Sequence, residues 1–169
     1  MPKPRIMLGG VPIVLHAGAP EETIAPIGGS ATLRMSGGAG VKMEHWQRWG
    51  GTISGSGWMP PGLAGLDYSQ PLELRSTKVL SHGGAGPVFP LLNTPRPDVA
   101  PWAQALLGDE WVTVPCVLAE GEVTVPPVAG ASLYQVCYMP IFSVFCDPPA
   151  ETQSAGTAAH GWTINWEET

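Results

Sequence analysis

Apolar and polar residues alternate in short runs along most of this chain, and a period of two residues is typical of half-buried β-strands. The runs that predict strands cover residues 5–8, 11–16, 31–35, 41–49, 52–57, 71–80, 111–118, 122–128, 133–146 and 161–166. Gly9-Gly10 separates the first two runs and tolerates the positive φ angles of a tight hairpin turn. Glu120-Gly121 separates a later pair. The pattern therefore predicts antiparallel hairpins.

Turn-forming residues mark where these strands end. Gly50-Gly51 predicts a turn, and Pro140 predicts a break inside the long run before Cys146. Residues 148–160 are rich in Gly, Ala and Ser and predict a loop. Residues 81–101 contain five prolines and predict an extended loop. Long ordered loops are usually functional, so this loop is a candidate arm that lies on a neighbouring chain.

Composition supports the same architecture. The 169 residues include 22 Gly and 19 Pro, which disfavours folds built from long uninterrupted elements. Only residues 99–107, which Asp98 could cap, predict a helix. We therefore expect an all-β fold, a sandwich or barrel of short antiparallel strands with long Gly/Pro-rich loops. With no long linker and no internal repeat, residues 1–169 are expected to form a single β-rich domain with an extended loop at about 81–101.

The amount and the distribution of charge limit the kinds of partner that this chain can bind. Charged residues make up only 13% of the chain, and the net charge is −6. Arg96 is the last basic residue, so residues 97–169 carry acids alone. An acidic chain without a basic run disfavours nucleic-acid binding, which depends on neutralising phosphates. Residues 123–146 are uncharged but contain three prolines and short alternating runs, which predict buried strands and no membrane insertion.

The sequence holds three cysteines, Cys116, Cys137 and Cys146, without the Cys-x-x-Cys spacing of a zinc or redox site. Each lies in an apolar, strand-like segment, where a free thiol behaves as a small buried hydrophobe. We expect inert, reduced thiols and no cofactor. The alternative is that the three, with His160, hold a metal ion or an iron–sulfur cluster.

No catalytic motif is present. The Gly-rich segments at residues 28–30 and 37–40 lack the Lys and the following helix of a phosphate-binding loop. Residues 55–57 lack the spacing of a nucleophile elbow, and Pro60-Pro61 opposes the helix that it needs. The four histidines are scattered singly. We expect a non-enzymatic protein; a small hydrolase whose site is assembled in space is the weaker alternative.

Tryptophan is unusually abundant for a chain of this size. The seven are Trp46, Trp49, Trp58, Trp102, Trp111, Trp162 and Trp166. Tryptophan fills β cores and anchors protein interfaces, and it also stacks on sugar rings. A Trp-rich core, a protein–protein interface and a carbohydrate-binding groove all remain open on this evidence.

Two loops carry large apolar residues that an isolated domain would expose, and exposed apolar patches mark contact sites. The loops are residues 55–66 and 81–101. The interface candidates on them are Trp58, Met59, Leu63, Phe89, Leu91 and Leu92. We expect these side chains to contact other chains.

Three stretches, residues 26–37, 45–63 and 161–168, together resemble small minor tail or tail-tip (baseplate) proteins of long-tailed bacteriophages. The likeness covers about a third of the chain and rests on loop and strand style. The resemblance implies a β domain that packs into a ring or trimeric hub around a tail channel. It implies a structural protein of the virion, made in the host cytoplasm, whose partners are copies of itself and other tail proteins.

The resemblance also bears on the cysteines. In some tail-tip proteins of this kind cysteines hold an iron–sulfur cluster, which usually takes four Cys ligands. This chain supplies three, so His160 or a neighbouring chain would have to complete the set. The alternative to a tail-tip component is a carbohydrate- or receptor-binding β module, in which the tryptophans would line a groove.

Overall fold

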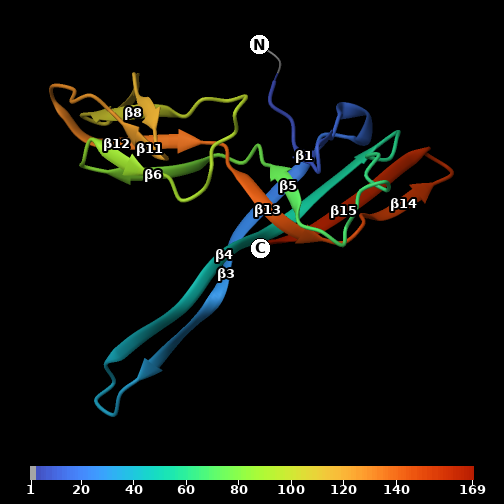
Figure 1. Ribbon diagram of the computed structural model, residues 1–169, viewed down its shortest axis with the longest axis horizontal. Helices are drawn as coiled ribbons and strands as arrows, with labels where there is room; N and C mark the ends of the chain where they lie inside the picture. The colour runs from blue at the N-terminus through green and yellow to red at the C-terminus, as the bar shows by residue number, and fades with distance from the viewer. Residues whose placement is uncertain (1–2) are drawn as a thin grey trace. The chain divides into compact units, whose positions relative to one another are not determined.

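The computed structural model describes residues 3–169, and this part of the chain is almost entirely β-structure (Figure 1). Its one helix is the three-residue 3-10 turn η1, Leu15–Ala17. The strands are antiparallel, as the alternating runs predict, and no barrel closes among the described residues. The all-β expectation is confirmed, and of its two forms the open, sandwich-like one applies.

The chain divides into two compact units. Unit 1 contains the described residues up to Pro12 together with Glu73–Phe142, and unit 2 contains Ile13–Leu72 together with Ser143–Thr169. Each unit is made of two separate chain segments, and the single domain expected over residues 1–169 stays a prediction.

Unit 1 contains a four-stranded sheet and a three-stranded sheet that share one core. The four strands, in sheet order, are β6 (Leu80–Gly84), β12 (Ala131–Tyr138), β8 (Trp102–Leu107) and β9 (Glu110–Val114). The three strands are β10 (Val117–Ala119), β11 (Glu122–Thr124) and β7 (Val88–Pro90). Both sheets contribute to one buried cluster: Phe89, Ala103, Ala105, Val123, Val125, Tyr134 and Val136.

Two tight hairpins in unit 1 confirm predicted turns. Strands β1 (Met7–Leu8) and β2 (Val11–Pro12) pair across Gly9-Gly10, whose φ angles of 55° and 83° are those of a primed turn. Strands β10 and β11 pair across Glu120-Gly121, with φ angles of 52° and 82°. Beside the first hairpin, β1 also pairs with β5 (Leu72–Arg75).

Unit 2 is built on three antiparallel strands, in which β4 lies between β3 and β15. These strands are β3 (Glu21–Arg34), β4 (Gly40–Gly57) and β15 (Ala159–Glu168). On the other edge of β15, β13 (Ile141–Cys146) pairs with the end of the strand and β14 (Ala150–Ser154) with its beginning. The break at Pro140 between β12 and β13 and the last strand are both as predicted.

One face of the unit 2 sheet forms its core. Ile53 pairs with Ile164, and both are buried together with Trp162 and Trp166. The indole of Trp162 donates a hydrogen bond of 2.7 Å to the carbonyl of Ala17. These two tryptophans therefore belong to the core.

Residues 99–107 do not form the predicted helix. They contain β8, in which buried Ala103 and Ala105 alternate with half-buried neighbours and both edges pair, with β12 and with β9. Pairing on two sides outweighs the weak intrinsic helix preference of this segment.

Three predicted breaks are also wrong. The strand β4 runs through Gly50-Gly51, because Gly51 pairs with Ile24 on one side and Trp166 on the other. The expected loop over residues 148–160 contains β14. Residues 81–101, expected as one extended loop, contain most of β6 and all of β7.

A buried arginine anchors unit 1. The Arg96 guanidinium donates to both carboxylate oxygens of Asp98, at 2.9 and 2.7 Å, and to the carbonyls of Arg5 and Ser76, at 2.7 and 3.2 Å. The Arg96 amide bonds to the carbonyl of Met139. Through its side chain and its amide, Arg96 thus joins its own segment to three others of unit 1, while the Asp98 carboxylate remains partly exposed.

Stability in acid should depend on Asp98. The hydrogen bond from Arg96 is the largest cause that lowers the pKa of this carboxyl. A carboxyl whose pKa is lower in the folded state contributes stability above its unfolded value of about 3.9, and this contribution is lost as pH falls further. We expect Asp98→Asn to lower the midpoint of urea unfolding at pH 7 and to have a much smaller effect at pH 3. Asp109→Asn, an exposed acid of the same unit, is the control; equal effects of Asp98→Asn at both pH values would contradict the prediction.

Candidate functional site

The far part of the β3–β4 hairpin extends beyond the rest of its sheet. The pairing of β15 with β4 ends at Glu167 and Gly50. Arg48 and Trp49 are tied to the end of the chain, through bonds to the Thr169 carbonyl and the Glu168 carboxylate. Residues 28–47, called the arm here, continue past β15 as a two-stranded ribbon whose outer edges pair with no other strand of the described chain (Figure 1).

The register of the arm places its apolar side chains on one face. Directly opposed residues of antiparallel strands share a face, and here Leu33 opposes Val41 and Ala31 opposes Met43. The register then shifts, so that Gly29 opposes Trp46 and one residue of β4 is bulged. The shift brings Trp46 onto the face of Val41 and Met43. The apolar arm face is therefore Ala31, Leu33, Val41, Met43 and Trp46.

These apolar side chains are exposed to solvent. The exposed fraction of the four large ones runs from 43% at Met43 to 54% at Leu33. The opposite face is polar; it carries Thr32 and the ion pair between Lys42 and Glu44, at 3.6 Å. The arm is thus an amphipathic ribbon whose apolar face has no cover among the described residues.

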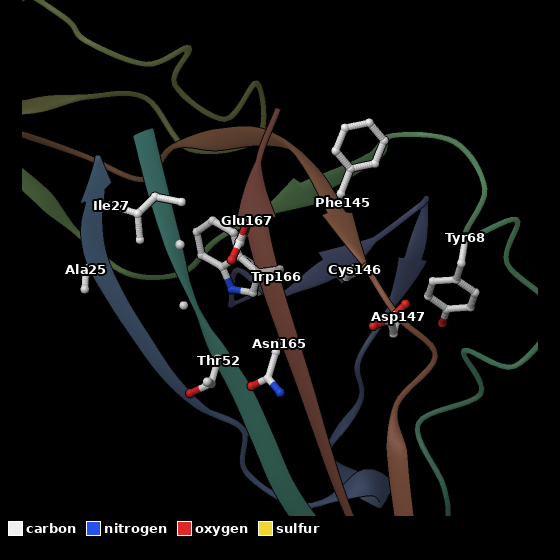
Figure 2. A pocket seen from close by; sticks show the side chains of 12 residues that line it. Ala25, Ile27, Thr52, Tyr68, Phe145, Cys146, Asp147, Asn165, Trp166 and Glu167 are labelled. Atoms are coloured by element: carbon white, nitrogen blue, oxygen red, sulfur yellow. The ribbon is translucent and has the colours of Figure 1, made fainter. Parts of the chain in front are cut away.

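A hollow of about 590 Å³ lies on the same face of the sheet, where the arm joins the body of unit 2. Figure 2 shows Ala25 and Ile27 of β3 at one side and Phe145 and Tyr68 at the other, with β4 and β15 between them. The register confirms one common face: Ala25 opposes Gly50, Gly50 opposes Glu167, and Glu167 opposes Phe145.

Small residues form the floor of the hollow, and its charged groups are acidic. Gly50 and Thr52 line it from β4, and Asn165 lines it from β15. Asp147 and Glu167 are its charged side chains. At the rim, burial raises the pKa of Tyr68, whose hydroxyl donates to the Leu63 carbonyl at 2.7 Å. This surface is suited to receive an apolar, cationic partner.

Two of the six predicted interface residues are core residues. Leu63 is 0% exposed and Phe89 is 6% exposed, so the expectation that an isolated chain exposes them is wrong. Phe89 lies on β7, a strand that the sequence did not predict because of its closely spaced prolines. Phe89 packs in the buried cluster of unit 1, and half-buried Leu91 packs against that cluster. Trp58, Met59 and Leu92 are exposed as expected, and their role in an interface stays a prediction.

Trp58 and Met59 form a small apolar ridge with η1. The amides of both residues donate to the His16 carbonyl at 3.1 Å, and the rings of His16 and Trp58 lie 4.7 Å apart. Leu15 beside them is exposed. The ridge presents a fixed aromatic ring to solvent.

The four candidate metal ligands are divided between the two units. Cys116 and Cys137 belong to unit 1, and Cys146 and His160 to unit 2. Residues 3–169 contain no group of three or more His, Cys, Asp or Glu side chains placed to hold a metal ion. Burial raises the pKa of each of the three thiols. The expectation of inert thiols without a cofactor stays a prediction.

The arm was not foreseen from the sequence. The sequence predicts a strand over residues 41–49 but does not show the register shift between Gly29 and Ser30. The one available signal is that Trp46 stands at an even position of this run, whereas Val41 and Met43 stand at odd ones.

No protein-family model matches the chain, and no curated protein matches it either. No helix of the described residues is long and apolar enough to span a membrane. The site defined by the geometry is thus an apolar arm and a hollow on one face of an all-β unit.

Proposed function

We propose that this chain is a non-enzymatic structural component of a bacteriophage tail tip or baseplate, which assembles with copies of itself and with other tail proteins in the virion. The apolar arm face is the observation that carries the self-assembly. The tail-tip setting rests on the resemblance of residues 26–37, 45–63 and 161–168. These stretches belong mainly to β3, β4 and β15, the sheet that bears the arm.

The physical argument is the free-energy cost of leaving the apolar arm face exposed to water. An isolated two-stranded ribbon is at best marginally stable, and it gains stability when a third layer covers its apolar face. Full burial of a Val, Leu or Met side chain contributes roughly 1.5–3 kcal/mol, so covering half-exposed side chains contributes about half as much each. A partner that covers the arm therefore stabilises both the arm and the assembly.

Low surface charge supports the same role. Charged side chains are depleted at the centre of protein interfaces because they lose water there. Only 13% of this chain is charged, and on the apolar arm face no residue is charged.

Assembly should depend on the apolar arm face. We expect the purified chain to oligomerise, and Leu33→Glu to weaken association at least tenfold, because the carboxylate would have to be desolvated at the contact. Light scattering with size-exclusion chromatography over a range of concentrations measures this.

Thr32→Glu is the matched control, since it adds the same charge one residue away on the opposite face. We expect it to leave assembly within about twofold of the parent, a difference of roughly 0.4 kcal/mol. A parent chain that stays monomeric at every concentration would refute self-assembly.

A carbohydrate- or receptor-binding module is the second candidate, and the ridge at Trp58 favours it. An exposed indole held in place by backbone bonds to His16 is the kind of surface on which a sugar ring stacks. A monomeric chain that binds glycans and loses this binding on Trp58→Ala would favour this function over assembly.

A further inference from the structure

We propose that the apolar arm face of one copy docks into the hollow of unit 2 of a second copy. This inference rests on the proposed function and names the two surfaces that meet. The arm surface is Ala31, Leu33, Val41, Met43 and Trp46; the hollow is the one between Ala25 and Phe145.

The arm cannot fill the hollow of its own chain. Both lie on the same face of the same strands, and from Gly50 to Val41 the strand β4 advances about 30 Å away from the hollow at roughly 3.3 Å per residue. Bringing the arm back would break the ladder between β3 and β4, which is continuous from Glu21 to Arg34 except for the one bulge. An arm that docks into the hollow must therefore come from another copy of the chain.

The hollow complements an apolar ribbon in shape. Its floor of Gly50, Thr52 and Asn165 leaves space where larger side chains would stand, and its wall includes Phe145, which is half exposed. A ribbon that projects Met43 and Trp46 from one face brings large side chains to a surface that has small ones. Apolar contact area at such a junction supplies the main favourable energy.

Charge favours a second copy as that occupant. The arm carries Arg34 and Lys42 against one acid, Glu44. Outside the arm, unit 2 has Arg48 as its one basic residue and seven acids: Glu21, Glu22, Asp67, Asp147, Glu151, Glu167 and Glu168. Arg34 and Lys42 stand on the polar face of the arm, so they attract the arm to this acidic body at long range and do not enter the apolar contact, whereas two arms repel each other. Every copy brings one arm and one hollow, so the same contact repeats through an assembly.

Cysteine cross-linking tests the contact directly when Asn165→Cys, an exposed position on the face that carries the hollow, provides one thiol. Met43→Cys places a second thiol on the apolar arm face, and Lys42→Cys places one on the polar face as the matched control. Asn165 is exposed, so the thiol introduced there is accessible to a mild oxidant. Peptide mass spectrometry on mixed heavy- and light-isotope copies identifies disulfides between copies.

We expect Met43→Cys to form an intermolecular disulfide with Asn165→Cys, and Lys42→Cys to form at least fivefold less. Equal yields, or linkage of Met43→Cys to a cysteine other than Asn165→Cys, would overturn the docking site. If the cross-linking overturns the docking site but Leu33→Glu still disrupts assembly, the proposed function stands without this docking site. A chain that never assembles refutes both.

A second experiment fills the hollow with a larger side chain. We expect Ala25→Trp to weaken association at least tenfold by occupying the place of the arm. Glu21→Trp lies on the same strand and face but outside the hollow, and it should leave association near the parent value. Far-ultraviolet circular dichroism verifies that both variants keep the β fold; folded variants with equal association would overturn the docking site.

Discussion

Replacing Arg96 with methionine is expected to lower the free energy of unfolding of unit 1 by about 3 kcal/mol. The substitution keeps an unbranched side chain of similar length but leaves the buried carbonyl of Ser76 and the part-buried carbonyl of Arg5 without their donor. Urea unfolding measures the loss, and amide hydrogen exchange of β8 and β12 assigns it to unit 1.

Arg75→Met is the control for this experiment. Arg75 pairs with Glu73 at 2.6 Å, but both side chains are partly exposed, so the expected loss is below about 1 kcal/mol. Equal losses at the two arginines would show that burial and multiple bonding of Arg96 do not matter. Arg96→Lys should also destabilise, because an ammonium group cannot reproduce the paired bonds to Asp98.

Replacing Trp162 with alanine is expected to lower the free energy of unfolding of unit 2 by about 4 kcal/mol. The indole is 2% exposed, and its removal leaves a cavity as well as the Ala17 carbonyl without its donor. The ring also fills the space above Gly55, where an added Cβ would lie 2.7 Å from the indole carbon Cζ2. Urea unfolding with hydrogen exchange of β4 and β15 measures the effect.

Two other variants separate the effect of lost volume from that of the lost hydrogen bond, and a core tryptophan from an exposed one. Trp162→Phe keeps most of the volume but not the hydrogen bond, so we expect a loss of about 1–2 kcal/mol. Trp58→Ala removes an exposed indole and should change stability by less than about 0.5 kcal/mol. A large effect at Trp58 together with a small one at Trp162 would contradict the assignment of core and surface tryptophans.

The structure assigns the tryptophans, which the sequence alone left open, to different places. Trp162 and Trp166 fill the unit 2 core, whereas Trp46 and Trp58 are exposed on the arm and on the ridge. Neighbouring residue types do not separate these groups. What separates them is whether another element covers the face on which each indole stands.

The proposed assembly uses the arm and the hollow as a pair. An uncovered apolar ribbon is a hazard for a lone chain, since exposed apolar edges invite nonspecific pairing. With a hollow on each copy to receive the arm, an ordered contact would replace this nonspecific pairing. The acidic body and cationic arm add orientation to a contact whose energy is mainly apolar.

The sequence by itself determined the strand character and the tightest turns. Alternation with a period of two and the positive φ angles tolerated by Gly9-Gly10 are local properties, and so is the break at Pro140. These features need no knowledge of distant residues, and the structure confirms them. The all-β class follows from the same local information.

Only the tertiary structure decided which faces are covered. Residues 99–107 became a strand because β9 and β12 pair on both sides, and β4 passes through Gly50-Gly51 for the same reason. Leu63 and Phe89 are buried, whereas the apolar side chains of the arm remain exposed because no other element of the described chain packs on their face. Burial depends on which strands meet, and that is settled by contacts between residues far apart in the chain.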